Sequence, residues 1–249
     1  MSDNAAPLIL LTRPRAASER AAAALRDRFG DAVTPVIAPL IEIFATTAAW
    51  DLSGVDGLIF TSEAGVATFA GVEARRDLLV WCVGDRTAAA AQAEGFSAMS
   101  ANGAADDLLA MITKAASAGR LLHLHGVHTR GDLVPRLRAA GIDAVGLAIY
   151  DQVETPVPAA LKAALSQSGP VIIPLFSPRT AALFAEAAGA SPGARYIPVA
   201  FSDAVKDQLP DDWKSTCRVT SAPRMEAMLA TIEGLISRPP WVEGPEPLV

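Results

Sequence analysis

The chain has 249 residues, of which 51% are hydrophobic and 19% are charged, and its formal net charge is −6. This length and composition allow one large domain or two small ones with a sizeable core, whereas the negative charge argues against a nucleic-acid surface or a basic membrane patch. No apolar run reaches the length of a membrane span, and the N-terminal stretch MSDNAAPLILLTRPR lacks the long apolar centre of a signal peptide.

The first elements expected are a short strand at 8–11, an Ala-rich helix at 16–29 that Gly30 ends, and a second strand in VTPVIA. The stretch at 56–70, DGLIFTSEAGVATFA, then joins an apolar strand to a helix at Ser62. Residues 170–185, PVIIPLFSPRTAALFA, repeat this junction at Ser177, with Pro178 suited to the first helical position. Each Ser is therefore predicted to cap a helix that starts at the end of a strand.

Other segments also occur in pairs along the chain. LRDRFGDAVTPVIA resembles LRAAGIDAVGLAIY, LLVWCVGDRTAAAAQA resembles YIPVAFSDAVKDQL, and MSANGAADDLLAMI resembles VTSAPRMEAMLATI. These pairs indicate a duplicated α/β unit that is cut into four blocks. Because continuous apolar strands alternate with helices, we expect α/β lobes with parallel sheets covered on both faces.

The junctions between the blocks suggest how the lobes are wired. KAASAG between the second and third blocks is as short as an ordinary loop, whereas the other junctions carry the strand-like pieces LIEIF and AIYDQV. We therefore predict one discontinuous lobe from 1–37 plus 153–238, a second lobe at 41–148, and interlobe linkers at 38–40 and 149–152. Two lobes in simple tandem are the alternative, and the Pro-rich tail 239–249 is expected to be disordered.

Standard cofactor and metal motifs are missing from the sequence. There is no GxGxxG after a strand, GxxxxGK[ST], HExxH or GxSxG. His123 and His125 alternate on one strand and share a face, but no third ligand accompanies them, so we expect hydrogen-bonded histidines and no metal. Cys82 and Cys217 lie in apolar runs without CxxC spacing, as expected for buried, reduced thiols in the cytoplasm.

Small polar groups recur where the predicted strands end, and in a parallel sheet these ends share one edge. Together they describe a polar cleft between two lobes, in which helix N-termini favour an anion; plain capping is the alternative for each residue alone. The set comprises Arg13, Thr61, Ser62, Gly84, Thr87, Gly126, Tyr150, Ser177, Arg179, Ser202 and Ser221.

The order of motifs over residues 8–236 resembles the uroporphyrinogen-III synthase family. The motifs are LLTRP, DGLIFTSEAGV, CVGDRTAAA, LHLHG followed by LVPRLRAAG, AIYDQ, LFSPRTAALF and a closing helix after a Pro. The resemblance implies two flavodoxin-like parallel-sheet lobes joined by a two-stranded linker. It also implies a cofactor-free hydro-lyase of haem biosynthesis that dehydrates and cyclises hydroxymethylbilane and inverts the last pyrrole ring to give uroporphyrinogen III. We expect the protein to be a cytoplasmic monomer.

The resemblance also assigns roles to residues. Tyr150 matches the family's Tyr, and its phenol, protonated near neutrality, would donate to the departing hydroxyl; a substrate carboxylate as proton donor and a merely packed tyrosine are the alternatives. The remaining candidates are expected to bind the substrate, with the arginines on its carboxylate arms. These candidates are Arg13, Thr61, Ser62, Gly84, Thr87, Gly126, Arg130, Ser177, Arg179 and Ser202.

Two positions depart from the expected pattern. Val205 stands where the family usually has Thr, so Ser202 would take over part of that contact. Pro174 in IIPLF cannot donate to a sheet, so it predicts a bulge or a strand near the sheet's edge.

Two other functions compete with the synthase hypothesis. A non-catalytic two-lobed protein that binds an anionic tetrapyrrole would use the same helix ends without needing Tyr150. A degenerate sensor is the other, and the absence of a helix-turn-helix segment counts against it. The small-molecule substrate is the main expected partner, with a transient contact to the preceding pathway enzyme as a further possibility.

Overall fold

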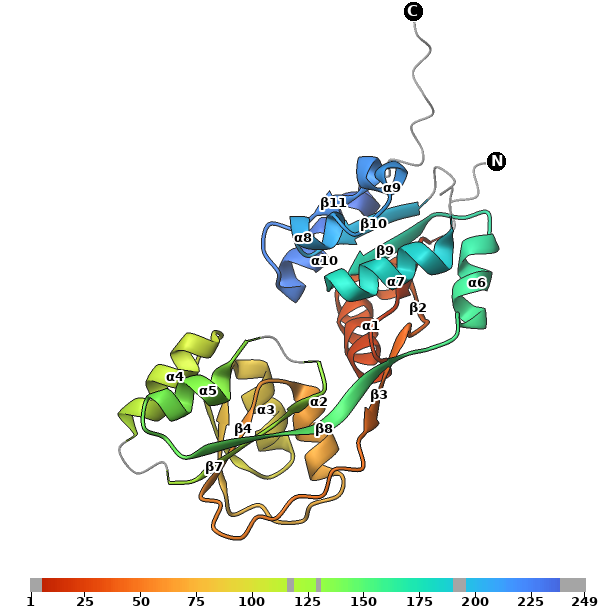
Figure 1. Cartoon of the computed structure of the whole chain (residues 1–249). Coiled ribbons are helices and arrows are strands. Elements are labelled where there is room, and N and C mark those ends of the chain that lie inside the picture. The colour runs from red at the N-terminus through yellow and green to blue at the C-terminus, as the bar shows by residue number, and fades with distance from the viewer. Residues whose placement is uncertain (1–5, 116–118, 129–130, 190–195, 238–249) are drawn as a thin grey trace, which may run out of the picture. The chain divides into compact units, whose positions relative to one another are not determined.

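The apolar runs of the chain form two separate sheets in the computed structural model, which describes residues 6–115, 119–128, 131–189 and 196–237 (Figure 1). By their internal contacts the residues group into two units, Met1–Glu42 with Glu154–Val249, and Ile43–Val153. The chain thus passes from one unit to the other twice. The tail expected to be disordered lies outside the described residues.

The first unit, which contains the chain's two ends, is built on a five-stranded sheet with the order β11-β10-β9-β1-β2. All of its neighbouring strands are parallel. The strands are β1 (Leu8–Leu11), β2 (Thr34–Ile37), β9 (Val171–Leu175), β10 (Tyr196–Ala200) and β11 (Arg218–Val219).

Helices cover both faces of this sheet because its strands are apolar on both sides. Ile9 and Leu11 on β1 pack with α1 and α10, whereas Leu10 faces the opposite side with α6, α7, α8 and α9. The helices are α1 (Arg15–Phe29), α6 (Ala159–Ser166), α7 (Pro178–Ala188), α8 (Asp203–Lys206), α9 (Asp211–Thr216) and α10 (Met225–Ser237), with a short 3₁₀ turn η1 at Gly30–Ala32.

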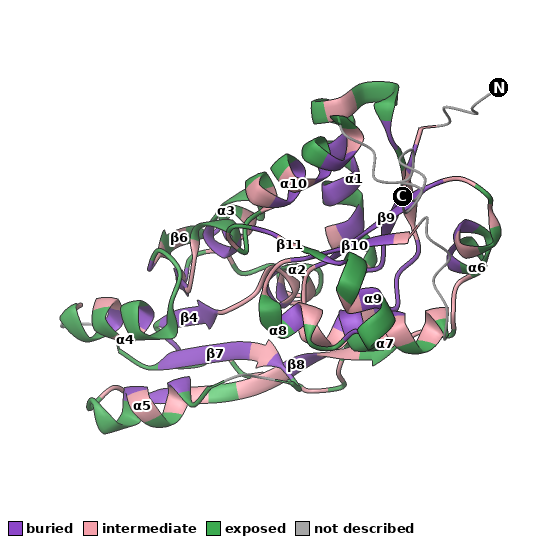
Figure 2. Cartoon of the chain, turned by 90° about the horizontal axis from the view of Figure 1, so that it is seen from above, coloured by how far each residue is buried: buried purple, intermediate pink, exposed green. Residues whose placement is uncertain are grey.

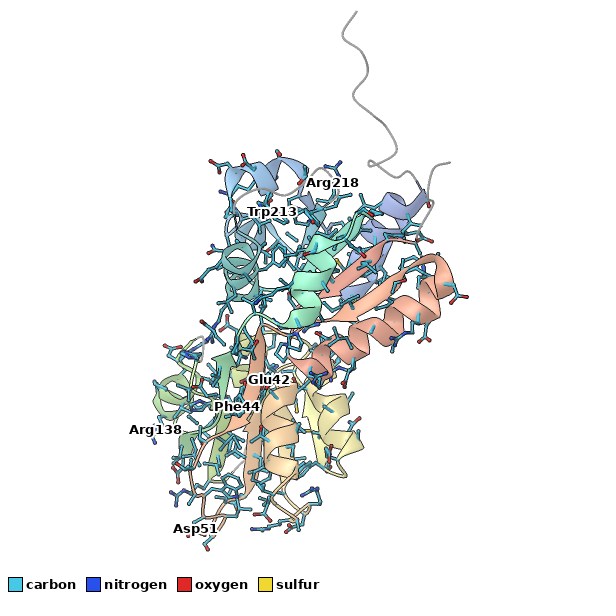
Figure 3. The ribbon with its side chains drawn as sticks, turned by 90° about the vertical axis from the view of Figure 1, so that its right-hand side faces the viewer. Glu42, Phe44, Asp51, Arg138, Trp213 and Arg218 are labelled. Carbon is cyan, nitrogen blue, oxygen red and sulfur yellow. The ribbon has the colours of Figure 1, made fainter. Side chains whose placement is uncertain are left out.

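Trp213 on α9, labelled in Figure 3, is the largest fully buried side chain of this unit. Its ring meets Phe184 edge-on at 5.2 Å and stacks on Tyr196 at 5.9 Å, both distances measured between ring centroids. Such aromatic pairs add to the stabilisation from burial alone. They fix the short helix α9 against β10 and α7.

Pro174 lies in a central strand and not at a bulge or an edge, so both sequence interpretations were wrong. Strand β9 runs between β10 and β1, and it pairs with β10 in regular register from Val171 to Leu175. The carbonyl of Leu175 accepts from the N–H of Phe201 on the β10 side, so the Pro174 nitrogen is turned toward β1. The regular pairing of β9 with β1 ends at Ile172, before Pro174, so this part of the ladder does not use an N–H at position 174.

The second unit has a six-stranded sheet with the order β3-β8-β7-β4-β5-β6. The pairs among β4, β5, β6, β7 and β8 are parallel. The strands are β3 (Ile41–Ala45), β4 (Gly57–Phe60), β5 (Leu79–Cys82), β6 (Ser97–Ser100), β7 (Leu121–Gly126) and β8 (Ala144–Glu154).

Strand β3 pairs with β8 in the opposite direction. The N–H of Thr46 donates to Ile149, and the N–H of Thr155 donates to Leu40, so residue numbers rise on one strand as they fall on the other. An antiparallel edge strand on an otherwise parallel sheet is common in α/β folds.

Helices also cover both faces of the second sheet. Leu122 and Leu124 on β7 pack with α2 and α3, whereas Leu121 packs with α4 and α5. These helices are α2 (Glu63–Ala70), α3 (Asp85–Ala93), α4 (Ala105–Lys114) and α5 (Leu133–Ala139). Figure 2 shows β4 and most of β7 buried, while the helices keep exposed outer faces. The mixed α/β architecture with parallel sheets confirms the predicted fold class at this level.

None of the helices within the described ranges is long and apolar enough to cross a bilayer.

Candidate functional site

The carboxyl edge of the second sheet carries a pocket of about 390 Å³. Strand β4 delivers Thr61 and Ser62 to this edge, β7 delivers Gly126, and β8 delivers Tyr150. Because parallel strands end at the same edge, residues distant in sequence meet there. The structure thus brings together four of the predicted site residues, and Ala105, His123, His125, His128, Gly131, Asp132, Leu133, Val134, Pro135, Arg136 and Gly146 also line the pocket.

Ser62 serves as the predicted N-cap of α2 and also contacts Tyr150. Its Oγ accepts a hydrogen bond from the N–H of Gly65 at 3.0 Å and lies 2.8 Å from the Tyr150 hydroxyl. A serine oxygen has two lone pairs and one proton, so it can hold both contacts together. The cap therefore fixes the position of the phenolic oxygen as well as the start of the helix.

Tyr150 packs over Gly126 at a local irregularity of the sheet. The pairing of β7 with β8 shifts register between His125 and Gly126, which places Gly126 opposite Tyr150. A Cβ at Gly126 would lie 2.7 Å from Tyr150 Cζ, so only glycine leaves room for the ring. Tyr150 is 6% exposed, and its hydroxyl is held at the pocket wall.

His123 and His125 line the same pocket from the face of β7 opposite to Leu122 and Leu124. Their ring centroids lie 4.8 Å apart. His123 Nε2 lies 3.3 Å from Thr61 Oγ1, and burial, aided by the neighbouring His125, lowers the pKa of His123 to about 3. His125 Nδ1 lies 2.8 Å from the Gly126 carbonyl oxygen. The histidines are hydrogen-bonded as predicted, and no cluster of three or more potential metal ligands occurs in the described part of the chain.

Gly84 is the N-cap of α3, and Thr87 lies in the first turn of this helix. Neither residue lines the pocket. Gly84 is the N-cap without a side-chain hydrogen bond, which leaves the first backbone N–H groups of α3 without a capping side chain. Thr87 is 6% exposed, so its side chain is largely covered. The helix end itself is therefore better placed to contact a ligand than the Thr87 hydroxyl.

Acidic side chains in the first turns of α2 and α3 have partners of their own. Glu63 pairs with Arg86, and Ser100 Oγ donates to Asp85 Oδ1 at 2.6 Å. Their charges are thus partly compensated locally, which reduces the repulsion that an incoming carboxylate would meet at these helix ends.

The first unit holds a second group of predicted residues at the carboxyl edge of its own sheet. Ser177 caps α7 as predicted, because its Oγ accepts from the N–H of Thr180 at 3.2 Å and lies 2.9 Å from the Thr180 hydroxyl. Arg179 follows in the first turn of α7 and contacts Glu154 at 3.4 Å. Arg130, the third arginine predicted to bind substrate, lies outside the described residues.

Arg13 follows β1 and stacks on an aromatic pair that sequence reasoning missed. Its Cζ lies 4.4 Å from the centroid of the Phe176 ring, and Phe176 meets Phe201 edge-on at 4.5 Å. Both phenylalanines directly precede a serine predicted to bind the substrate, in LFSP and AFSD. That repeated Phe-Ser pair was the available signal, since side chains at such positions share the edge of the sheet.

Ser202 and Val205 belong to the four-residue helix α8. Ser202 is the N-cap but makes no side-chain capping bond. Val205 is 2% exposed and packs with Leu209 and Trp213 in the core. An apolar residue suits this position, and Thr87 at the corresponding position of α3 is also buried.

Neither cysteine supplies a nucleophile to these edges. Burial raises the pKa of Cys82 to about 12, and burial also raises the pKa of Cys217. Both are buried in the core, as predicted. Besides carboxylates such as Asp132, the groups available at the edges are hydroxyls, imidazoles, guanidinium groups and backbone N–H groups.

Comparison with known proteins supplies a family. The model of the family described as uroporphyrinogen-III synthase HemD matches residues 19–230. A uroporphyrinogen-III synthetase from Helicobacter pylori has a similar structure, with a TM-score of 0.63, 15% identity, and coverage of 92% of this chain and 99% of that chain. A mutant uroporphyrinogen III synthase from Thermus thermophilus matches with a TM-score of 0.48, 17% identity, and coverage of 94% and 100%. A search of curated proteins finds no match.

Proposed function

The chain belongs to the uroporphyrinogen-III synthase family, and on that premise we propose how its residues perform the family's reaction. The enzyme is a lyase of tetrapyrrole biosynthesis. It dehydrates and cyclises hydroxymethylbilane, a linear tetrapyrrole with acetate and propionate arms, to uroporphyrinogen III with the last ring inverted.

The reaction requires a proton donor at the start and control of geometry throughout. When the C–O bond of the hydroxymethyl group breaks, the oxygen needs a proton to leave as water, and the first ring becomes an electrophilic azafulvene. The substituted carbon of the last ring then attacks, and the resulting spiro intermediate fragments and recloses with that ring turned over. The free position of the last ring finally loses a proton, so no net proton is consumed.

Tyr150 is our candidate for the proton donor, with Ser62 as its positioning residue. The observation that carries this proposal is the 2.8 Å contact between Ser62 Oγ and the Tyr150 hydroxyl in the pocket wall. Since Ser62 Oγ already accepts from Gly65, its own proton is available for the phenolic oxygen. In that arrangement the Tyr150 proton points away from Ser62 and can pass to the departing hydroxyl.

We propose that helix N-termini and arginines hold the carboxylate arms. The starts of α2, α3 and α7 offer backbone N–H groups and the positive end of a helix dipole, and these bind anions without a large net positive charge. Arg13 and Arg179 in the first unit would pair with further carboxylates, as would Arg130 and the N-terminal region of α8 at Ser202. This would allow a protein with a net charge of −6 to bind a polyanion.

At the level of the whole chain, we propose two flavodoxin-like lobes joined by the two strands β3 and β8. The two parallel sheets, each with helices on both faces, support this description. We further propose that the enzyme is a cytoplasmic monomer that meets the preceding pathway enzyme only transiently. The two buried, unpaired cysteines suit such a reducing compartment.

Replacing Tyr150 by Phe tests the proton donor. The variant removes one hydroxyl and keeps the ring over Gly126, so we expect turnover of hydroxymethylbilane to fall at least about tenfold with the fold intact. Tyr196→Phe is the matched control, because that hydroxyl donates to the Leu165 carbonyl in the first unit. Full turnover by Tyr150→Phe would assign the proton to another donor, such as a substrate carboxylate.

A further inference from the structure

Beyond the acid and the anion contacts, the pocket holds an acceptor that the mechanism above does not use. His125 Nδ1 faces the Gly126 carbonyl oxygen at 2.8 Å, and because a carbonyl only accepts, Nδ1 carries the proton in the neutral ring. Nε2 then carries a lone pair and no proton, so it can accept a hydrogen bond. It has no hydrogen-bond partner among residues 6–115, 119–128, 131–189 and 196–237.

Gly146 keeps the space beside this nitrogen open. A Cβ at Gly146 would lie 3.1 Å from His125 Nε2, which is closer than most such contacts, and 3.4 Å from Val134 Cγ2, an ordinary van der Waals distance. The pocket wall here is completed by Leu133, Val134 and Pro135 at the start of α5. We call this part of the pocket, lined by His125, Leu133, Val134, Pro135 and Gly146, the slot.

The companion histidine offers no positive charge to this slot. His123 is buried, its ring lies 4.8 Å from that of His125, and burial lowers its pKa to about 3, so it remains neutral at physiological pH. A neutral lone pair repels a carboxylate and attracts an N–H donor. At Nε2 itself, therefore, a donor group of the substrate fits better than one of its carboxylates.

We propose that this slot between β7, β8 and α5 binds one pyrrole ring of the substrate, with His125 Nε2 accepting the pyrrole N–H. On a linear tetrapyrrole with ionised carboxylate arms, the N–H donors are those of the rings. The whole pocket, which Thr61, Ser62 and Tyr150 also line, measures about 390 Å³, near the lower end of the roughly 300–1,000 Å³ typical of small-molecule sites. This inference rests on the proposed function and names a subsite within it.

Two substitutions distinguish the roles of the two nitrogens of His125. Gln places its side-chain amide oxygen near the position of Nε2, whereas Asn can replace only Nδ1 and its bond to Gly126. We expect His125→Asn to raise the KM for hydroxymethylbilane about tenfold, the effect of losing one hydrogen bond, and His125→Gln to remain within about threefold of the wild type. Gly146→Ala should match His125→Asn, because the new methyl covers Nε2.

The opposite pattern overturns the inference. If His125→Asn binds like the wild type, or if His125→Gln is as impaired as His125→Asn, Nε2 is not an acceptor for the substrate. Thermal unfolding of each variant checks that it folds. As a measurement on the unmodified enzyme, nitrogen-15 NMR of labelled histidine should show the Nε2 resonance of His125 shift when uroporphyrinogen III is added without oxygen, and an unshifted resonance also overturns the inference.

These outcomes are distinct from a failure of the proposed function. If the wild type released only the isomer formed without a catalyst, the synthase mechanism itself would fail. If the wild type makes uroporphyrinogen III while His125→Asn keeps the wild-type KM, only the pyrrole subsite fails.

Discussion

Ser62 shows how one side chain links folding to chemistry at the scale of a residue. Its oxygen caps α2 through Gly65 and lies 2.8 Å from the Tyr150 hydroxyl. Loss of an N-cap costs about 1 kcal/mol of stability, a modest price for a protein of this size. The larger consequence of losing Ser62 would be a phenol without a fixed orientation, because catalysis depends on where the proton points.

His123 connects pH to stability through its burial. Its pKa in the folded protein is about 3, below the ordinary value of 6.5 that it regains on unfolding. As pH falls below 6.5, the unfolded chain takes up a proton before the folded one, so stability decreases with falling pH until about pH 3. At pH 7.5 His123 is neutral in both the folded and the unfolded protein, so it does not lower the free energy of unfolding there.

We predict that this histidine alone removes about 2 kcal/mol from the free energy of unfolding between pH 7.5 and pH 5. Urea unfolding of the wild type and of His123→Gln at both pH values measures the effect. The loss between the two pH values should be smaller in the variant by about that amount. Equal losses in both proteins would show that His123 is not buried in its neutral form.

At the scale of elements, the ends of strands β4 and β7 position Thr61, Ser62 and Gly126 in the site of the second unit. Strand β4 ends at Phe60 and α2 begins at Glu63, so the two residues between them are Thr61 and Ser62. Strand β7 ends at Gly126, where the sheet shifts register to face Tyr150 on β8. The site thus depends on the lengths of these strands, and an irregularity of one residue decides which side chain reaches the edge.

Gly126→Ala tests this arrangement. The added methyl would meet Tyr150 at 2.7 Å from Cζ and 3.0 Å from the hydroxyl oxygen, so the ring has to move away from Ser62. We expect turnover to fall at least about tenfold, as far as in Tyr150→Phe, and the double variant Gly126→Ala with Tyr150→Phe to be no slower than Tyr150→Phe alone.

Gly234→Ala on α10 is the matched control for this substitution. No atom lies within 4 Å of a Cβ built at Gly234, so it should keep full turnover and gain slightly in stability as a helical alanine. If Gly126→Ala also kept full turnover, the packing of Tyr150 on Gly126 would have no part in catalysis.

The elements were largely predictable from sequence because their signals are local. Ser62 and Ser177 as caps, Pro178 as the first residue of α7 and the parallel sheets all follow from patterns within about fifteen residues. Pro174 was misread because sequence does not tell where a neighbouring strand stops pairing. The contact of Ser62 with Tyr150 joins segments far apart in the chain, so no local pattern could predict it. For the stacking of Arg13 on Phe176, the repeated Phe-Ser pair signals the aromatic ring but not its distant partner.

For the whole molecule, the two units repeat one architecture but present different chemistry. The edge of the second unit holds a hydroxyl pair and two histidines, whereas the edge of the first holds Arg13 on the Phe176–Phe201 pair and the cap of α7. The internal similarity of the sequence predicts the shared architecture. It cannot predict this division of chemistry, which depends on the residues where the two copies differ.

The central claim is that this chain directs ring closure by holding a flexible polyanion, and that it does not simply accelerate closure. The most direct test is to supply purified protein with hydroxymethylbilane, oxidise the products to porphyrins and separate the isomers by chromatography. We predict that the type III isomer predominates and forms faster than the spontaneous product. Release of the type I isomer alone, at the rate seen without protein, would contradict the account.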